Sequence, residues 1–356
     1  MRRAWLIVVA AVILSWQSRG DEPKKKYRIV SPKDVGIVAT GINARGDIVG
    51  FEWIASKKDP NVIEQVPFFA SGKTITYLSP PAGYTAVFPA AVSDDGVVVG
   101  HAGKPAPAGR VPLRNQAFVW DAKTGMHLLG VLADDFISYA RDISADSRRI
   151  CGYSIGDNRA RACIWDRDGA GWKGTALPHT ANISTDIVTM SDNGKFVASL
   201  AGQKPCLWSE RQAGIWSQEF IGGPGSFAPR SVNNAGMVVG VLHALDSLDH
   251  AVIWSRDQGF KQLEMPAGYV NSQANAVNNE GAVVGMADGP RGSKTGPDAF
   301  VYEAGRLRLI DEGGPSFASA TAINDRGQVA GVFEQKEEDE HRQPGQPVKP
   351  EARKAR

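Results

Sequence analysis

The stretch "INARGDIVG", Ile42 to Gly50, returns near the other end of the chain as "INDRGQVAG", Ile323 to Gly331. Related stretches occur between these two at spacings of roughly 42 to 51 residues, which suit a unit of four short strands with their turns, as in one blade of a β-propeller. The repeat therefore predicts an all-β fold. The five intermediate copies are "VSDDGVVVG" from Val92, "ISADSRRICG" from Ile143, "MSDNGKFVA" from Met190, "VNNAGMVVG" from Val232 and "VNNEGAVVG" from Val277.

Each copy has the residue pattern of a β-hairpin turn. An Asn or Ser that can bond to its own backbone comes first, as at Asn43, and a Gly that tolerates positive φ follows three residues later, as at Gly46. The third copy departs, because Ser147 replaces the Gly and one extra residue follows, so we expect a wider turn between Ser144 and Arg149. The equivalent turn residues elsewhere are Gly96, Gly194, Asn233, Gly236, Asn278, Gly281, Asn324 and Gly327.

A second recurrent glycine ends the strand after each turn. Glycine within a strand destabilises by roughly 0.5–1 kcal/mol relative to Ala, so we expect another group to pack closely against it. An aromatic residue recurs in the following strand, and a large ring covering a facing glycine is a known cross-strand arrangement. The glycines are Gly50, Gly100, Gly152, Gly240, Gly285 and Gly331, with Ala198 in the fourth copy, and the aromatic residues are Trp120, Trp165, Trp208, Trp254 and Tyr302, with Ala70 in the first unit.

The strand that carries the aromatic residue resembles the signature of the extracellular HAF-repeat family. The matching triplets are Gln116-Ala117-Phe118, Asp298-Ala299-Phe300 and, less closely, His250-Ala251-Val252, and no complete His-Ala-Phe triplet is present. The resemblance covers about residues 27 to 333. It implies an exported, propeller-like protein, and since the family has no known activity, it transfers no catalytic residue.

The repeats predict a propeller domain over residues 27–333. Counting the first strand as "YRIV", Tyr27 to Val30, gives six complete units and a seventh of three strands, which lacks only the aromatic-bearing strand. Seven blades with an incomplete last blade are the main expectation. A six-bladed ring with extra strands and a stacked β-solenoid are the alternatives.

The two ends of the chain differ in composition from the repeats. Residues 1–20 have the basic start, apolar run and small-x-small site of a secretory signal peptide, with an uncleaved membrane anchor as the alternative. Residues 21–26 form a linker, and the charged residues 334–356 are predicted to be disordered. The sequence thus predicts a secreted, periplasmic or cell-surface protein without a stable membrane span after cleavage.

Composition and motifs give little support to enzymatic or nucleic-acid chemistry. The 40 basic and 38 acidic residues nearly cancel, so no nucleic-acid partner is expected. "GYSIG", Gly152 to Gly156, matches a nucleophile elbow with Ser154, but it falls in a repeat strand rather than before a helix. "GPRGSKTG", Gly289 to Gly296, lacks the residue order of a phosphate loop. We therefore predict no catalytic residue and no cofactor.

Cysteine and metal-ligand patterns lead to similarly modest expectations. Three cysteines are an odd number for a disulfide framework and are interpreted as buried apolar residues, although Cys151 and Cys163 could pair after export while Cys206 remains free. The histidines, including His101 and His250, are read as surface residues, and the acidic turns lack calcium-ligand spacing, so no metal is predicted.

Function is expected on the loops that do not repeat. Long insertions follow the strand after the repeated turn in units one, two and six, at Phe51 to Val66, His101 to Gln116 and Met286 to Asp298. They should lie on one face and in one sector of the ring, and such loops commonly carry function. The main hypothesis is a monomeric, non-enzymatic binding protein for a protein, glycan or envelope component. The alternative is a glycan hydrolase or lyase. The candidate binding-face residues are Tyr84, Phe136, Phe227, Tyr269, Phe317, Arg110, Arg114 and Lys294. The alternative for the aromatic residues among them is that their rings plug the gaps between blades.

Overall fold

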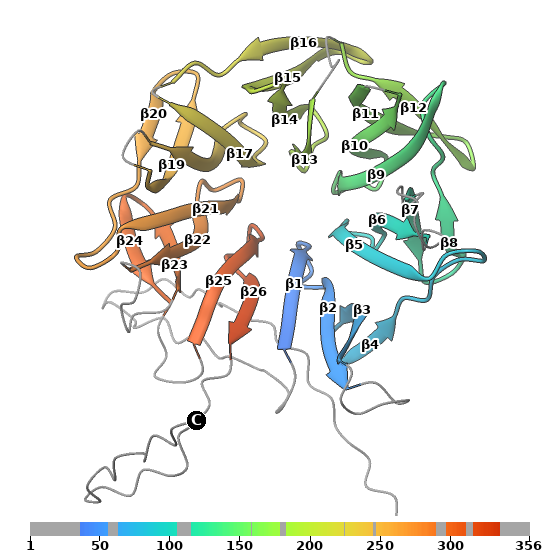
Figure 1. The fold of residues 1–356 in the computed structure, drawn as a ribbon, viewed down its shortest axis with the longest axis horizontal. Coiled ribbons are helices and arrows are strands. Elements are labelled where there is room, and N and C mark those ends of the chain that lie inside the picture. Colours follow the sequence, from blue (N-terminus) through green and yellow to red (C-terminus); the bar gives the residue numbers. More distant parts are fainter. Residues whose placement is uncertain are drawn as a thin grey trace, which may run out of the picture.

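The strands form a ring around a central channel, the architecture of a β-propeller (Figure 1). The computed structural model describes residues 36–334 apart from 56–62, 105–114, 158, 179–182, 224, 245–246, 290–296 and 311–315. Within these residues there are 26 strands. No helix in the described part of the chain is long and apolar enough to cross a membrane.

Each complete repeat is an antiparallel sheet of four consecutive strands, with the first strand at the channel and the fourth at the rim (Figure 1). The first three repeats comprise β1 (Gly36–Ile42), β2 (Ile48–Ala55), β3 (Ile63–Ser71) and β4 (Thr74–Tyr77); β5 (Ala86–Val92), β6 (Val98–Gly103), β7 (Gln116–Asp121) and β8 (Gly125–Leu128); and β9 (Asp135–Ile143), β10 (Arg149–Gly156), β11 (Arg159–Asp168) and β12 (Gly171–Ala176).

The remaining repeats continue in the same order around the ring. They comprise β13 (Ile183–Met190), β14 (Phe196–Ala201), β15 (Lys204–Gln212) and β16 (Ile215–Phe220); β17 (Ser226–Val232), β18 (Val238–His243), β19 (Asp249–Ser255) and β20 (Gly259–Gln262); β21 (Asn271–Val277), β22 (Val283–Asp288), β23 (Asp298–Glu303) and β24 (Arg306–Leu309); and the two strands β25 (Ser316–Ile323) and β26 (Val329–Glu334) of the seventh repeat.

The seventh repeat does not form a separate sheet. Its strand β26 pairs with β1 at Val332 and Val38, so β25 and β26 extend the first sheet to six strands. The ring therefore has six sheets, and the expectation of seven blades is wrong by one, whereas the six-sheet alternative holds. Strand β24 corresponds to the opening strand of the expected seventh unit, but it pairs with β23 and completes the sixth blade. The predicted first strand, Tyr27 to Val30, lies outside the described residues.

The apolar core is divided among the joints between successive repeats. Seven buried clusters occur, and each combines residues of two neighbouring repeats. Trp120 fills the joint between the first and second repeats, Trp165 the next and Trp208 the one after. Each recurrent aromatic ring therefore packs against the preceding blade, which is the apolar contact that holds one blade to another.

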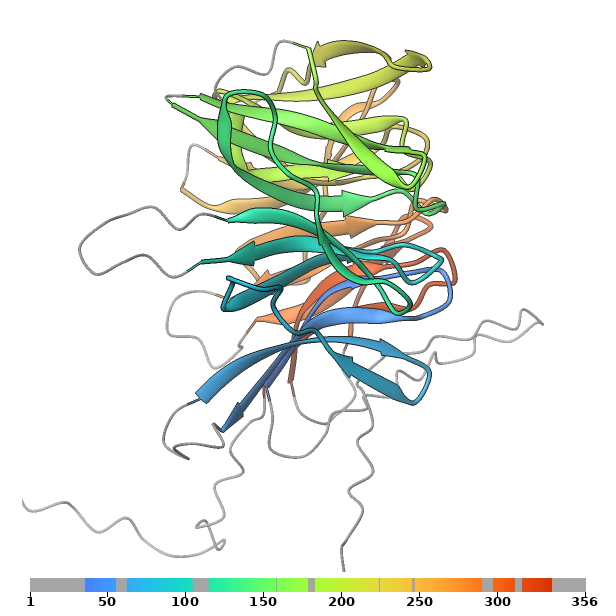
Figure 2. The same ribbon diagram turned by 90° about the vertical axis from the view of Figure 1, so that its right-hand side faces the viewer.

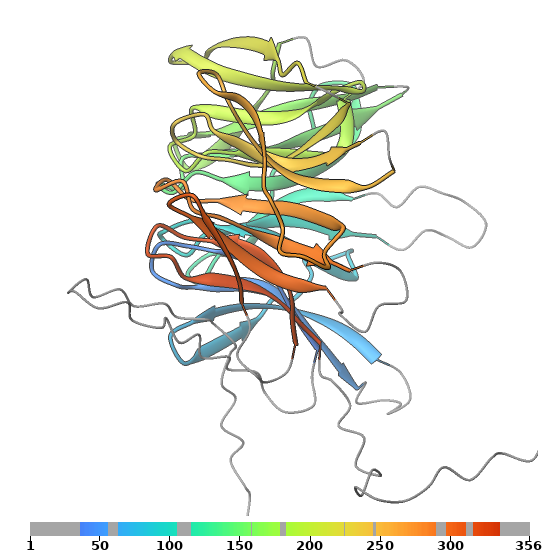
Figure 3. The ribbon, with the colours of Figure 1, turned by 90° about the vertical axis from the view of Figure 1, so that its left-hand side faces the viewer.

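The turns between the first and second strands of the repeats gather on one face, here called the turn face (Figures 2 and 3). Asn43 shows how the predicted turn works, because its Oδ1 accepts hydrogen bonds from the backbone N of Arg45 and Asp47 at 3.0 and 2.8 Å. Its Nδ2 donates to the Ser93 carbonyl of the next turn at 2.8 Å. Asn324 Nδ2 donates to the Asn43 carbonyl at 2.7 Å, which links the last turn to the first.

The predicted wider turn of the third repeat is confirmed. Ser147 adopts a φ of 59°, and Ser144 N bonds to the carbonyl of Arg149, one residue beyond the span seen in the first turn. The fourth turn is wide as well, since Ser191 N bonds to the carbonyl of Phe196. The sequence pattern did not reveal this second case, because the fourth turn retains its Gly194.

Candidate functional site

The recurrent strand glycine exists because the backbone of the first strand approaches it closely. A Cβ atom at Gly100 would lie 2.0 Å from the Phe88 carbonyl oxygen, and one at Gly285 would lie 1.9 Å from that of Gln273. The expected aromatic cover is thus wrong as the main cause, since Trp120 pairs with Val98 and not with Gly100. Phe300 does approach Gly285, at 2.8 Å from the same Cβ position, but the carbonyl is nearer.

The close approach accompanies a β-bulge in the first strand of the repeat. Opposite each of the six glycines, one residue of the first strand has no partner in the second strand, and the register shifts there. The fourth repeat, which has Ala198 instead of Gly, pairs continuously from Val188 to Met190. Bulges often lie beside functional sites, and here the glycine leaves room for the backbone of the bulged first strand. The six bulged residues are Thr40, Ala90, Arg141, Arg230, Asn275 and Thr321.

The bulged residues line the central channel, which has a volume of about 710 Å³. Strands β1, β5, β9, β13, β17, β21 and β25 all contribute to its wall, and in the fourth repeat Val188 is part of the lining. Small-molecule sites in proteins commonly have volumes of roughly 300–1,000 Å³. The channel is therefore large enough to admit a small ligand or one residue of a larger one.

Three bulged residues form hydrogen bonds that help to close the ring. Asn275 Nδ2 donates to the Ala320 carbonyl at 2.8 Å, Thr321 Oγ1 to the Ala39 carbonyl at 2.6 Å, and Thr40 Oγ1 to the Pro89 carbonyl at 3.2 Å. Each bond runs to the backbone of the next repeat's first strand. These three consecutive repeats, sixth, seventh and first, form what we call the closing sector.

Two bulged residues on the other side of the ring are arginines. Arg141 on β9 and Arg230 on β17 flank β13, and both line the channel. Arg230 is exposed, and among the described residues it has no hydrogen bond or ion pair to another group. Arg141 is half-buried, with its guanidinium carbon 5.8 Å from the centre of the Tyr153 ring. We call the first strands of the third to fifth repeats the arginine sector.

An arc of aromatic rings lies next to Arg141. The rings of Phe88 and His101 stack at 4.7 Å, the edge of His101 meets Tyr139 at 4.6 Å, and Tyr139 stacks on Tyr153 at 4.6 Å. Burial, together with the nearby charge of Arg141, lowers the pKa of His101 to about 4. His101 is therefore neutral at physiological pH, and the expectation that it is a surface residue is wrong.

The acidic groups of the channel lie toward the turn face. Asp142 accepts hydrogen bonds from the backbone N of Ile143 and Met190 at 2.9 Å each and from Thr189 Oγ1 at 3.2 Å. Burial raises its pKa to about 6 in spite of these bonds. Asp192, in the fourth turn, bonds to Asn279 Nδ2 at 2.7 Å, and burial also raises its pKa. Asp142 is therefore held by the neighbouring fourth repeat, and Asp192 by the sixth repeat, two repeats further along the ring.

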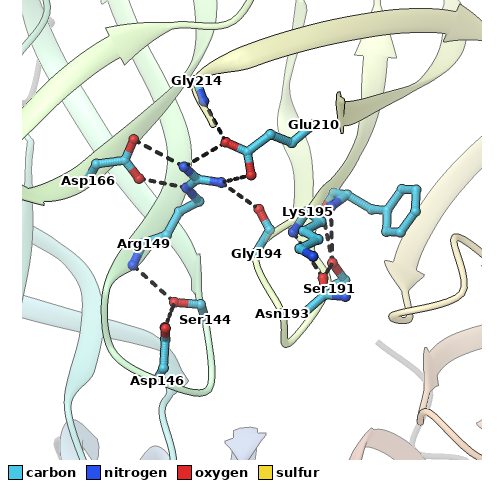
Figure 4. A network of polar contacts seen from close by, with 11 residues as sticks. Ser144, Asp146, Arg149, Asp166, Ser191, Asn193, Gly194, Lys195, Glu210 and Gly214 are labelled. Carbon is cyan, nitrogen blue, oxygen red and sulfur yellow. Dashed lines mark hydrogen bonds and ion pairs between the residues drawn. The ribbon is translucent and has the colours of Figure 1, made fainter. Parts of the chain in front are cut away.

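A charged network joins the third and fourth repeats outside the channel (Figure 4). Arg149 donates to Asp166 at 2.6 Å and to Glu210 at 2.7 and 3.1 Å, and a further bond at 3.0 Å reaches the Gly194 carbonyl. Burial opposes the charge of Arg149, but the bonds to both carboxylates outweigh it and raise its pKa. Glu210 also accepts a hydrogen bond from Gly214 N. The charged groups of this network are therefore bonded within the network and serve to join the two repeats.

The predicted binding-face residues do not come together as one site. Tyr84 and Tyr269 are anchors, since their hydroxyls bond to Gln116 at 2.8 Å and to Asp298 at 2.5 Å. Phe136 is 39 % exposed, whereas Phe227 is 1 % exposed and packs against Phe260 in the joint between the fourth and fifth repeats, so Phe227 is not a binding-face residue and the alternative that it fills a gap between blades is confirmed. The backbone of Phe317 belongs to β25. Three further candidates, Arg110, Arg114 and Lys294, lie outside the described residues.

The remaining chemical candidates have structural roles. Ser154 is buried in β10, and its hydroxyl bonds to Leu132 N and the Ile137 carbonyl, so it is not a nucleophile. The three cysteines are buried free thiols. Cys163 pairs with Gly152, the residue next to Cys151 on β10, whereas Cys151 itself pairs with Ile164. Because neighbouring residues of a strand point to opposite faces, the two thiols lie on opposite faces of the sheet, and the suggested disulfide is excluded. Among the described residues, no group of three potential ligands could hold a metal ion.

Sequence reasoning missed Arg141 and Arg230. Once the repeats are aligned, both occupy the position two residues before the last apolar residue of the first strand, where the other repeats have Thr, Ala, Val or Asn. This variable position in the aligned repeats was the available signal. Without knowledge of the bulge, ordinary strand alternation does not assign these side chains to the channel.

Comparison with known proteins supports the fold. No family model matches the sequence, and no curated protein matches it. Among solved structures, a puromycin hydrolase is similar with a TM-score of 0.55 and 14% identity over 80% of this chain. Prolyl oligopeptidase B from Galerina marginata is similar with a TM-score of 0.53 and 11% identity over 85% of this chain. The Pyrococcus horikoshii acylaminoacyl peptidase is similar with a TM-score of 0.52 and 10% identity over 84% of this chain.

This chain spans about half the length of these structures, covering 48%, 43% and 51% of them respectively. At such low identities the similarity concerns the propeller fold alone. The peptidase activities that their names record are properties of those proteins.

Proposed function

We propose that this protein is an exported, non-enzymatic propeller of the HAF-repeat type that binds a ligand in its channel. The ligand, which belongs to a glycan, a protein or another envelope component, enters from the face opposite the turn face. The observation that carries the proposal is the ring of bulges, in which constant glycines hold a variable set of side chains at the channel wall. Variation at channel-lining positions on a constant scaffold is expected of a binding surface.

The position of the long insertions supports entry from that face. The strand ends that flank them, Ala55 and Ile63 in the first repeat and Asp288 and Asp298 in the sixth, lie at the opposite end of the strands from the turns (Figure 2). The corresponding ends in the second repeat are Gly103 and Gln116. The sixth, first and second repeats are brought together by the closing sector, so the insertions start from one side of the ring.

The channel chemistry favours binding over glycan cleavage. Hydrolysis by two carboxylates requires an acid and a base or nucleophile that both reach the substrate. Asp142 has the raised pKa of an acid, but its oxygens accept three hydrogen bonds inside the joint between the third and fourth repeats. Asp192 is bonded to the sixth repeat through Asn279.

A channel-filling variant tests the proposal. Ala90→Trp places a large ring in the channel wall, and Thr74→Trp, on the exposed outer strand β4, is the matched control. Wild type and both variants are screened on a glycan array and by pull-down from envelope extracts. Ligands should be lost from Ala90→Trp and retained by Thr74→Trp. Equal binding by all three proteins would contradict the channel as the site.

Export is tested separately. Expression of the full chain in a host with a secretory pathway, followed by mass measurement of the recovered protein, should show cleavage between Gly20 and Asp21. An intact amino terminus on protein retained in the cytoplasm would contradict the export part of the proposal and leave the channel experiment unaffected.

A further inference from the structure

The outer strand of the fourth repeat, β16, is the least protected of the six rim strands (Figure 1). Natural sheets keep their edges from pairing with other chains by making them short or by placing Lys or Pro on them. Strands β4, β8, β20 and β24 have four residues each, and β12 carries Lys173 and two glycines. Strand β16, "IWSQEF", has six residues and contains no Lys, Arg, Pro or Gly. Its edge is therefore suited to pairing with another strand.

Two large apolar side chains of β16 face solvent. Ile215 and Phe220 are each 57 % exposed, the highest value among the large apolar residues that the structure describes. Trp216 lies on the same face of the strand as Phe220 and is partly buried against the joint between the third and fourth repeats. One face of β16 thus has an aromatic residue near each of its ends.

The backbone of β16 also presents hydrogen-bonding groups along its outer edge. Ile221 N donates to the Pro205 carbonyl of β15 at 2.8 Å, so this N–H points into the sheet. Because backbone groups alternate between the two edges along an antiparallel strand, those of Trp216, Gln218 and Phe220 point outward. No other strand in the described part of the chain pairs with this edge.

We propose that a second copy of this protein pairs with β16 through its own β16, in an antiparallel arrangement centred on Gln218. A two-fold axis at Gln218 places Trp216 of each copy opposite Phe220 of the other. Aromatic residues that lie directly opposite each other on antiparallel strands stabilise the pair. The same register joins the outward-pointing backbone groups of the two strands to one another. The resulting dimer is independent of the channel ligand and differs from the monomer expected from the sequence.

Charges on the other face of β16 agree with this register. Arg211 Nε donates to Ser217 Oγ at 2.9 Å, and Arg256 Nε donates to Glu219 at 2.7 Å. In the proposed pair, Ser217 lies opposite Glu219 of the second copy, which brings the Arg211 guanidinium toward that carboxylate. A register centred on Ser217 would instead place the apolar Ile215 opposite Glu219. The strand is therefore complementary to itself on both faces, and the net charge of +2 causes little repulsion between copies.

Sedimentation equilibrium of the protein recovered from expression of the full chain tests the pairing. Wild type should show a monomer–dimer equilibrium that depends on protein concentration. Gln218→Pro removes the outward N–H at the axis, a change that edge strands tolerate, and should weaken dimerisation by at least about tenfold. The matched control is Gln262→Pro on β20. Since Leu263 N donates to the Ala251 carbonyl, the N–H of Gln262 also points outward, and this variant should dimerise as wild type does.

Two further variants protect the test against a folding defect. Phe220→Ser leaves the backbone of β16 intact and should also weaken dimerisation, because each copy loses the ring opposite Trp216. Circular dichroism and thermal unfolding of every variant verify that the fold is retained.

Cysteine cross-linking fixes the register. Ser217→Cys/Glu219→Cys places a thiol opposite a thiol of the other copy at a Cα separation of about 4.5 Å, which suits a disulfide. Mild oxidation should therefore give a covalent dimer on a non-reducing gel. Ser217→Cys alone should not, since each new thiol then lies diagonally from its counterpart. The three natural cysteines are buried free thiols in every variant.

The inference is overturned if wild type remains monomeric up to about 0.5 mM, or if Gln218→Pro and Phe220→Ser both dimerise as wild type does. It is also overturned if Gln262→Pro disrupts the dimer as strongly as Gln218→Pro, or if the double cysteine variant gives no covalent dimer. None of these results bears on ligand binding in the channel, which Ala90→Trp tests separately.

Discussion

The closing sector and the arginine sector use the same bulge in different ways. In the closing sector, Thr321 Oγ1 reaches the Ala39 carbonyl at 2.6 Å, and the bulged side chain supports the ring. In the arginine sector, Arg230 projects into the channel, while the third and fourth repeats are joined outside it by Arg149. The difference shows that the repeated glycine maintains a backbone geometry, and that the residue placed at the bulge decides between ring closure and exposure to a ligand.

The bulge geometry shared by both sectors should be the most sensitive feature. Gly100→Ala would place a Cβ 2.0 Å from the Phe88 carbonyl, so the two strands must separate. We expect a loss of about 4 kcal/mol in the free energy of unfolding, measured by urea denaturation. The matched control is Ala198→Gly, at the equivalent position without a bulge, where the change should stay within about 1 kcal/mol. Equal effects of the two substitutions would contradict the proposed role of the glycine.

The arginine sector should also respond to pH through Asp142. Burial raises the pKa of this carboxyl from 3.8 to about 6, so the folded state binds the proton more tightly than the unfolded state does. The stabilisation is fully present below about pH 4 and is lost as pH rises to about 6, with a total of up to about 3 kcal/mol. Comparing urea denaturation of wild type and Asp142→Asn across this range isolates the contribution. A stability difference between them that does not change with pH would contradict it.

The Arg149 network should have a smaller effect on the same sector. Arg149→Gln leaves Glu210, which is 12 % exposed, without its cation, and we expect a loss of about 2 kcal/mol in the free energy of unfolding at pH 7. Because the Arg149 bond outweighs burial and lowers the pKa of Glu210, the stabilisation persists at neutral pH and disappears as pH falls below about 4. A loss of the same size in both acidic and neutral buffer would argue against the ion pair as its cause.

Much of the scaffold was predictable from local chemistry. The turn at Asn43 and Gly46 follows from hydrogen bonds and φ preferences within a few residues, so its sequence pattern is sufficient. The number of sheets could not be predicted from the sequence pattern, because it depends on a single strand pair between Val38 and Val332, which are far apart in the sequence.

The candidate site was harder to predict for a related reason. The sequence makes Tyr84 and Phe227 candidates for exposed aromatic residues, but Tyr84 is anchored to Gln116 and Phe227 is buried in a joint between blades. Arg141 and Arg230 carry no motif, and both stand at bulges, where the regular alternation of the strand is interrupted. The glycine pattern indicates that another group lies close to each glycine. Only the structure shows that this group is the backbone carbonyl of the first strand, and that the first strand carries a bulge there.

The smallest expected effect compares the two sectors directly. Thr321→Val keeps the shape of the side chain and removes its bond to the Ala39 carbonyl, so the free energy of unfolding should fall by about 1 kcal/mol. Arg230→Gln should change it by no more than about 0.5 kcal/mol, since no bond to another described residue is lost. Both are measured by urea denaturation in the same buffer. If Arg230→Gln destabilised the protein as much as Thr321→Val, then Arg230 would also stabilise the ring, and the proposed difference between the two sectors would be wrong.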